Sequence, residues 1–188
     1  RCLVGSEMCI RDSLLSQAEH DPRARAIMVT NSEKLANLVS DEVERQLSQL
    51  PRESIARPAI ENNSYIAVMD SVEDMFTVMN EVAPEHLEIQ LPDPMEYMSM
   101  VENAGSVFLG RYASEPLGDY VGGTNHVLPT SGTAKFSSPL GVYDFVKRIS
   151  FTQFSRERLQ EVAKDITTLA RTEGLEAHAR AIEVRFEK

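Results

Sequence analysis

The sequence predicts an α/β fold with a mainly parallel, incomplete sheet, followed by a C-terminal helical arm. Two observations support this prediction. Short apolar runs of strand length alternate with segments whose apolar residues recur at helical spacing, which is typical of parallel α/β proteins. Beyond residue 141 the strand-like runs stop and the pattern is helical. We therefore expect an α/β domain over residues 14–141 and a helical arm over 142–188.

The first thirteen residues, RCLVGSEMCIRDS, have neither a helical nor a strand period. They resemble a translated sequencing-adapter tail, so we treat 1–13 as a non-native tail and exclude it from the fold prediction. Both cysteines, Cys2 and Cys9, lie in it. The rest of the chain then has no cysteine, which excludes a disulfide framework and a thiolate zinc site there. We expect the natural protein to continue upstream of Leu14.

The α/β domain begins with the last turns of a helix over 14–20, which an Asp-Pro pair ends. The run AIMVT, over 26–30, has the length of a strand. Apolar residues at helical spacing then predict a helix over about 32–49, and Thr30 with Glu33 forms a capping-box pattern before it.

A loop is predicted next, because Pro51 and Pro58 bracket it. The run YIAVM, over 65–69, is a second buried-strand candidate. Ser71 with Asp74 provides the cap of a further amphipathic helix.

Two more strands are expected, HLEIQL over 86–91 and SVFL over 106–109, with a short helix from Asp93 to about Asn103 between them. From Gly110 to Gly141 the periodicity stops, in a stretch rich in Gly, Ser, Thr and Pro. Long ordered loops are usually functional, and this one keeps aromatic and aliphatic residues, so we expect a functional loop.

The arm is predicted to hold two helices. The first is capped by Ser155 and interrupted by Gly174, and the last runs from Leu175 to Phe186.

The composition excludes several classes of protein. The 188 residues carry a net charge of −10 without a Lys/Arg cluster, which argues against nucleic acid or anionic membrane as the main partner. No apolar run approaches the roughly 20 residues that cross a bilayer. We expect a soluble, cytoplasmic protein.

Two pairs of residues early in the chain are candidates for chemistry. Gln17 and His20 lie three apart on one helical turn, which suits two ligands of one metal but also fits a solvated helix end. Glu85 and His86 follow Pro84 at the start of a predicted strand. His can act as a general base and Glu can activate water, although an exposed pair beside a turn has the same pattern.

Further candidates lie in the long loop and the arm. Asp119 and His126 fall within GDYVGGTNHVLPT, which is either a ligand-binding loop or a flexible surface loop. His178, five residues after Glu173, is either a metal ligand or a histidine at the edge of a helix–helix contact. Taken together, Gln, His, Asp and His would form a nitrogen and oxygen site that suits zinc or another borderline divalent metal.

Five motifs then occur in a characteristic order: LLSQAEH, APEHLEI, AGSVFLG, LGDYVGGTNHVLPTSGTAKFSSPLGVYDFVKR and EGLEAHARAIEVR. From Leu14 to the C-terminus the chain resembles the C-terminal half of the histidinol dehydrogenases. The resemblance implies a zinc-dependent enzyme with an incomplete Rossmann-like domain. It would oxidise L-histidinol to L-histidine, the last step of histidine biosynthesis, through histidinaldehyde and with two NAD⁺.

The resemblance also implies residue roles. The zinc ligands, which also contact the substrate, would be Gln17, His20, Asp119 and His178. The last would come from the partner subunit of a homodimer with exchanged arms. Glu85 and His86 match the catalytic pair, His86 also binding substrate, while Glu173 and His126 match substrate-binding positions. Most NAD contacts would lie upstream, so we expect this chain alone to bind NAD poorly and to turn over little.

Two other functions remain open at this point. A metal-dependent hydrolase could use the same zinc with Glu85 as its base, and would hydrolyse an imidazole ester without NAD. A non-catalytic zinc-binding dimerisation module would be insensitive to replacement of Glu85 and His86.

Overall fold

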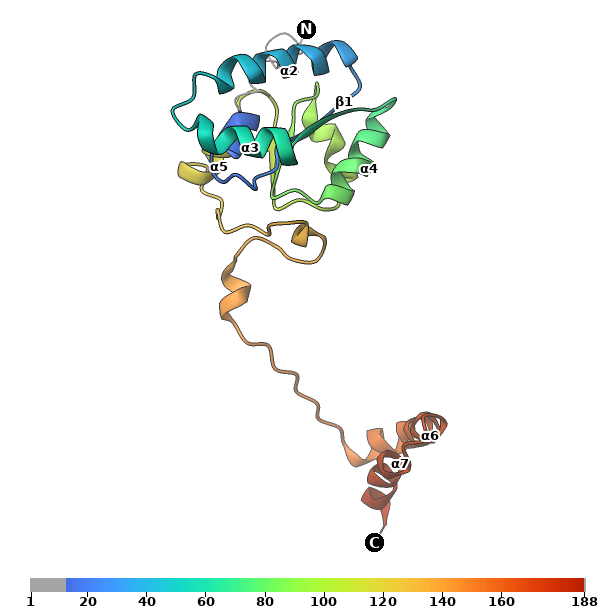
Figure 1. Ribbon diagram of the computed structural model, residues 1–188. Helices are drawn as coiled ribbons and strands as arrows, with labels where there is room; N and C mark the ends of the chain where they lie inside the picture. The colour runs from blue at the N-terminus through green and yellow to red at the C-terminus, as the bar shows by residue number, and fades with distance from the viewer. Residues whose placement is uncertain (1–12, 188) are drawn as a thin grey trace. The chain divides into compact units, whose positions relative to one another are not determined.

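The computed structural model describes residues 13–187 (Figure 1). They form two compact units that divide between Phe145 and Val146. The sequence places this boundary at residue 141, and the difference is the short 3₁₀ helix η3 (Val142–Phe145), which falls with the larger unit. The expected foreign tail lies, except for Ser13, outside the described residues, as do both cysteines.

A first parallel sheet opens the larger unit. Its elements, in chain order, are a helix at 13–18, β1 (Ile27–Thr30), α2 (Glu33–Leu47), α3 (Glu53–Asn63) and β2 (Tyr65–Val68). β1 and β2 pair in parallel with Ile27 opposite Tyr65. Buried aliphatic side chains of α2, among them the fully buried Val39 and Leu47, form the core together with Leu15 of the first helix. The predicted strand–helix alternation is confirmed here.

The cap of α2 differs from the prediction. Ser32 is the N-cap, and its hydroxyl accepts a hydrogen bond from the Leu35 amide at 3.2 Å. The predicted capping box of Thr30 and Glu33 is wrong because Thr30 is the last residue of β1. The Thr30 hydroxyl accepts instead from the amide of Ser32, so it supports the residue that caps the helix.

The predicted loop between Pro51 and Pro58 is also wrong, because α3 runs through Pro58. Proline removes one hydrogen bond from a helix interior, which usually ends the helix. Here Ala56 and Ala59 are fully buried in the core, and this packing keeps the segment helical. On the outer side Arg57 forms ion pairs with three glutamates, Glu44, Glu53 and Glu61.

A second parallel sheet follows. Its elements are α4 (Val72–Val82), β3 (His86–Ile89), the 3₁₀ helix η1 (Pro94–Met100) and β4 (Ser106–Leu109). β3 and β4 pair in parallel with His86 opposite Ser106. The predicted cap is confirmed, since the Ser71 hydroxyl accepts from the Asp74 amide at 3.0 Å. Phe76, Leu87 and Ile89 form the core of this half.

The mixed α/β class with parallel strands is therefore confirmed, but the strands form two sheets of two rather than one sheet. α4 follows β2 in the chain and contacts β1. The chain then leads from α4 into β3, the first strand of the second sheet. Two four-residue strands are not stable alone, so each pair depends on the helices packed against it. The Rossmann-like arrangement remains a prediction.

The stretch from Gly110 to Gly141 is not the uninterrupted loop that the sequence predicts. It contains α5 (Glu115–Tyr120) and the 3₁₀ helix η2 (Thr133–Lys135). Beyond α5, the Asn125 side-chain amide donates to the Leu140 carbonyl at 2.6 Å, and the Leu140 amide donates to the Val127 carbonyl at 2.9 Å. These bonds close residues 125–140 into a loop whose two ends meet.

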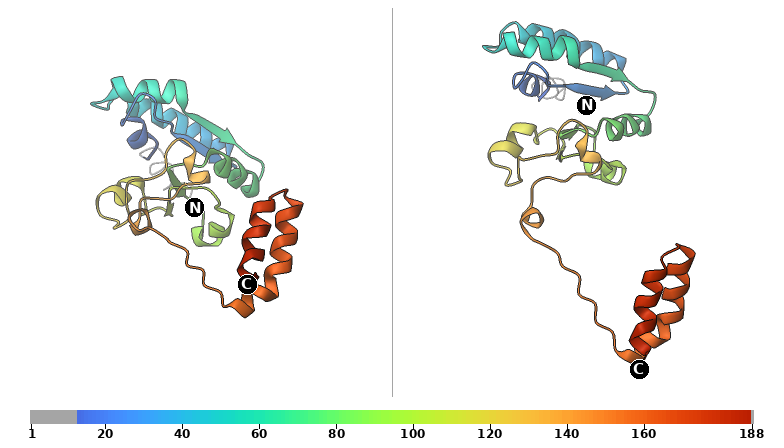
Figure 2. Two further views of the ribbon diagram at one scale, coloured as in Figure 1. Left: turned by 90° about the horizontal axis from the view of Figure 1, so that it is seen from below. Right: turned by 60° about the horizontal axis from the view of Figure 1, so that its bottom comes forward.

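The smaller unit is a pair of helices that lie side by side (Figure 2). They are α6 (Arg156–Thr172) and α7 (Glu176–Glu183), the latter extended by the 3₁₀ helix η4 (Val184–Phe186). The predicted cap is confirmed, since the Ser155 hydroxyl accepts from the Arg158 amide. Gly174 makes the turn with a φ of +78°, a conformation that favours glycine. Nowhere in residues 13–187 is a helix long and apolar enough to cross a membrane.

Candidate active site

The start of β3 holds Glu85 and His86 in place through main-chain contacts with β4. The amide of Gly105 donates to the Pro84 carbonyl at 2.9 Å, and the amide of Ser106 donates to the Glu85 carbonyl at 2.8 Å. A Cβ atom on Gly105 would lie 2.6 Å from the Glu85 carbonyl oxygen. Only glycine therefore permits this close approach, which fixes the backbone that carries the pair.

His86 is the most unusual side chain of this region. Both its ring nitrogens are buried and, among the residues that the structure describes, neither has a hydrogen-bond partner. The ring packs against Phe108, with centroids 6.0 Å apart. Burial lowers the pKa of His86, so the neutral form is favoured near neutral pH. Buried polar atoms in proteins are nearly always paired, so these nitrogens indicate a place for a ligand.

Glu85 is half-buried next to His86. Burial raises the pKa of the Glu85 carboxyl, and the nearby negative charges of Asp119 and Glu115 raise it further, while His86 opposes the shift. A carboxylate with a raised pKa is a better proton acceptor at neutral pH than an exposed one. The pair therefore combines a neutral histidine with a basic carboxylate, as proton-transfer chemistry requires.

The helix α5 brings two acids to the same point. Glu115 and Asp119 are four residues apart, so their side chains lie on one face of the helix. One ligand atom from each of them and one from His86 lie within 4.8 Å of one another. A ring nitrogen and two carboxylates at such distances could hold a divalent cation of the zinc type.

The first helix approaches the same cluster from the other end of the unit's sequence. His20 Nε2 lies 3.9 Å from Glu115 Oε1, and the Ser16 hydroxyl donates to Glu115 Oε2 at 3.3 Å. Gln17 is half-buried and lies between Ser16 and His20 in the sequence. Segments about one hundred residues apart therefore meet at Glu115.

The structure thus gathers four of the predicted site residues, His20, Glu85, His86 and Asp119, around Glu115, which the sequence pattern did not single out. Glu115 was missed because the segment around it was predicted to be a loop. A signal was present: Ser114 followed by Pro116 is a typical helix start, and on a helix the spacing from Glu115 to Asp119 puts both acids on one face.

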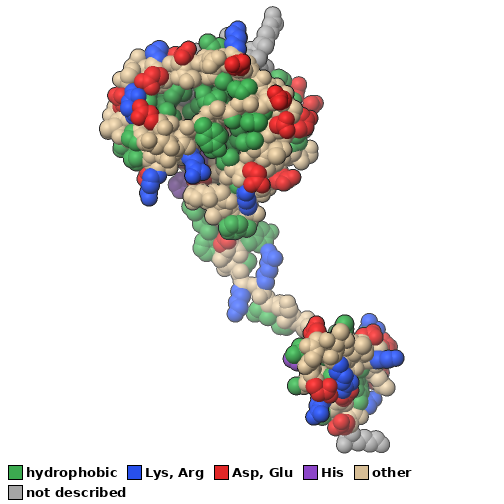
Figure 3. All heavy atoms as spheres, turned by 45° about the vertical axis from the view of Figure 1, so that its right-hand side comes forward, with side chains coloured by type: hydrophobic (Ala, Val, Ile, Leu, Met, Phe, Trp, Pro, Cys, Tyr) green, Lys and Arg blue, Asp and Glu red, His purple; other side chains and the backbone are tan. Residues whose placement is uncertain are grey.

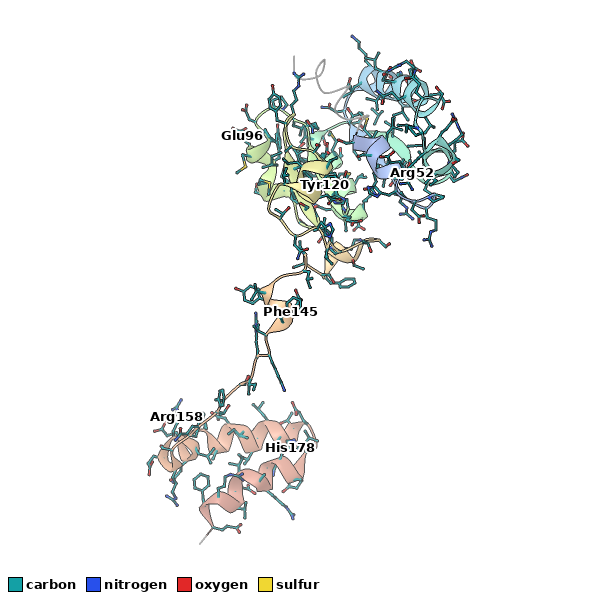
Figure 4. The ribbon with its side chains drawn as sticks, turned by 90° about the vertical axis from the view of Figure 1, so that its left-hand side faces the viewer. Arg52, Glu96, Tyr120, Phe145, Arg158 and His178 are labelled. Carbon is teal, nitrogen blue, oxygen red and sulfur yellow. The ribbon has the colours of Figure 1, made fainter. Side chains whose placement is uncertain are left out.

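The other predicted residues lie elsewhere. The His126 side chain is exposed, on the segment that Asn125 ties to Leu140. Glu173 and His178 belong to the smaller unit, Glu173 as the C-cap of α6 and His178 on α7 (Figure 4). Both side chains are exposed there.

Gly118 offers a test of how α5 supports His86. A Cβ atom at Gly118 would lie 2.7 Å from Cζ of Phe108, whose ring packs against His86. We expect Gly118→Ala to displace this ring and to lower the free energy of unfolding by about 1–3 kcal/mol, the usual cost of overpacking. Urea unfolding measures it. Gly141→Ala, whose Cβ would meet nothing closer than 3.9 Å, is the control. Alanine has a higher helix propensity than glycine, so without the contact to Phe108 the substitution would stabilise α5. A Gly118→Ala variant more stable than the parent would therefore contradict this packing.

A model of the histidinol dehydrogenase family matches residues 6–186, and this match begins inside the stretch that was set aside. A histidinol dehydrogenase of Lactiplantibacillus plantarum is 65% identical over 174 residues, which cover 93% of this chain and 41% of the relative. One from Streptococcus mutans is 62% identical over 175 residues, with the same coverage of both chains.

A solved structure gives the same result. The crystal structure of histidinol dehydrogenase from Elizabethkingia anophelis matches with a TM-score of 0.80 and 38% sequence identity. The match covers 98% of this chain and 41% of that one. The chain therefore spans about two fifths of the length of the relatives it matches.

Proposed function

Because the chain belongs to the histidinol dehydrogenase family, we propose that it supplies the zinc and substrate site of an enzyme that oxidises L-histidinol to L-histidine with NAD⁺. One observation carries the proposal. The family's match coincides with a partly buried cluster in which His86 lies beside Glu85, Asp119 and Glu115, and neither ring nitrogen of His86 has a hydrogen-bond partner within residues 13–187.

The residues present fit a zinc ion. The proposed ligands are Gln17, His20 and Asp119 of the larger unit and His178 of the smaller one, a nitrogen and oxygen set without thiolates. The unpaired nitrogens of His86 support a ligand at this point, because burial without a partner is otherwise costly. Bound zinc supplies a Lewis-acidic anchor for the amine and imidazole of histidinol, and NAD⁺ accepts the hydrides.

The first oxidation requires a base at the alcohol. Neutral His86 would accept the hydroxyl proton as the hydride of the same carbon passes to NAD⁺, and the product would be histidinaldehyde. The lowered pKa of His86 keeps its ring unprotonated and ready for this transfer. Phe108 packs against the ring and holds its orientation.

The second oxidation requires water. Glu85 accepts a proton from a water molecule that adds to the aldehyde carbon, and the resulting hydrate gives a second hydride to another NAD⁺ to form the carboxylate. Its raised pKa makes Glu85 a suitable base for this step. Glu173 and His126 are assigned to substrate binding.

We assign the smaller unit to an arm that is exchanged between two copies of the chain, so that the fourth ligand of each zinc is His178 of the partner subunit. The segment 142–154 supports this assignment, because it exposes hydrophobic side chains that a partner could bury (Figure 3). They include Tyr143, Phe145, Ile149 and Phe151, the last 92% exposed.

A graft tests the proposed function. Residues 14–188 would replace the matching segment of the Lactiplantibacillus plantarum histidinol dehydrogenase, and histidinol-dependent NADH formation would be measured. We expect activity within about tenfold of the parent enzyme, a barrier change of about 1.4 kcal/mol or less. It should be lost on chelation and restored by zinc.

Asp119→Asn in the grafted enzyme should weaken zinc binding and lower the histidinol-dependent activity, with more zinc needed to restore it, since an amide is a weaker ligand than a carboxylate. Asp41→Asn, an exposed acid on α2, is the control. Hydrolysis of an imidazole ester without NAD would instead favour a metal-dependent hydrolase. Unchanged activity after replacement of both Glu85 and His86 would favour a non-catalytic zinc-binding module.

A further inference from the structure

Glu115 is a buried acid to which the proposed mechanism gives no role. Its residue is 6% exposed, although it lies on a six-residue helix near the surface. A buried carboxylate is costly unless it is paired and hydrogen bonded. The contacts of the Glu115 carboxylate therefore indicate its role.

The contacts of Glu115 connect three segments of the larger unit. Its main-chain amide donates to Glu88 Oε1 of β3 at 3.1 Å. Its carboxylate accepts from the Ser16 hydroxyl and lies 3.9 Å from His20 Nε2, and one of its oxygens lies within 4.8 Å of an oxygen of the Asp119 carboxylate. Glu115 thus contacts two of the proposed zinc ligands, one from each end of the unit.

Hydrogen bonding alone does not explain the acid. A glutamine at this position would keep the main-chain bond to Glu88 and could still accept from Ser16. What glutamine would lack is the negative charge, and that charge is unfavourable in the chain by itself. The Glu115 side chain is buried, and one of its carboxylate oxygens lies within 4.8 Å of an oxygen of the Asp119 carboxylate, so a negative charge here loses its solvation and is repelled by its neighbour.

A bound cation reverses this balance, because it would interact favourably with the same buried acids that repel one another without it. Residues that contact metal ligands commonly orient them, and in other proteins their loss weakens metal binding substantially. We propose that Glu115 is a positioning residue of the zinc site, which holds Asp119 and His20 together for the metal. The inference rests on the proposed zinc site and adds a residue to it.

The test is the affinity of the full 188-residue chain for zinc itself, measured by competition with a chromophoric chelator. We expect Glu115→Gln to raise the dissociation constant for Zn²⁺ about 10- to 100-fold. The visible spectrum of bound Co²⁺ should change as well, because Asp119 and His20 are no longer held. The Tm of the metal-free variant should equal or exceed that of the parent chain.

Glu73→Gln is the matched control, since Glu73 also lies in the first turn of a helix behind a serine N-cap but is exposed. Ser16→Ala is the second variant. It removes the donor to Glu115 Oε2 and leaves every proposed ligand intact, so it should weaken zinc binding severalfold.

Unchanged zinc affinity in both Glu115→Gln and Ser16→Ala would overturn the proposal. A lower Tm with unchanged affinity would show that Glu115 is only structural. Asp119→Asn distinguishes a failure of the role of Glu115 from a failure of the proposed zinc site. If the parent chain binds zinc and Asp119→Asn abolishes binding while Glu115→Gln does not weaken it, only the role of Glu115 fails. If Asp119→Asn has no effect, the proposed zinc site itself fails.

Discussion

Replacing Glu85 by glutamine in the grafted enzyme is expected to lower the overall rate by about 10²–10⁴-fold, the usual contribution of a positioned general base. The two oxidations should respond differently. His86 accepts the proton in the first, so histidinol should still yield one NADH. The second needs water activated by Glu85, so histidinaldehyde should accumulate. Single-turnover measurement of NADH per histidinol, with trapping of the aldehyde, distinguishes one equivalent from two.

Glu102→Gln is the control for this variant, because Glu102 is an exposed glutamate on the loop before β4. His86→Ala should give the complementary result, a slow first oxidation with histidinaldehyde, if supplied, still oxidised. If Glu85→Gln slows both oxidations equally, Glu85 is not the specific base of the second step and acts on both.

Replacing Leu47 by alanine should destabilise the larger unit by about 2–5 kcal/mol, the usual cost of removing a buried leucine. The Leu47 side chain is fully buried, at the C-terminal end of α2, in the core that also holds Val39 and Ala56. Urea unfolding followed by circular dichroism measures the loss. The site should weaken with it, because this core holds the first helix, which carries Gln17 and is followed directly by the turn that carries His20.

Leu38→Ala on the same helix is the control, since Leu38 is 39% exposed and should contribute about 0.5 kcal/mol or less. A Leu47→Ala variant as stable as Leu38→Ala would mean that α2 is not packed as described.

Several parts of the fold could be predicted because their causes are local. Ser71 and Ser155 cap helices through bonds to residues three positions along, and such signals are visible in any single sequence. Buried strands such as β1 and β4 are short apolar runs between polar segments. The pattern offered Glu85 and His86, at the start of β3, as one of several candidates, and their assignment as a catalytic pair comes from the family resemblance.

Other parts depended on contacts between distant segments. Pro58 predicts a break, yet α3 continues because Ala56 and Ala59 are buried against α2 and its neighbours. The division into two sheets likewise follows from which strands meet in space, which the strand pattern alone does not specify.

The sequence by itself determined the family, the alternation of strands and helices, and the residues that carry the proposed chemistry. The tertiary structure alone decided that Glu115 of α5 is buried and lies beside Ser16 and His20, near the other end of the larger unit's sequence. The physical reason is that periodicity and capping act over a few residues. The position of a buried carboxylate is decided by side chains from segments about one hundred residues apart.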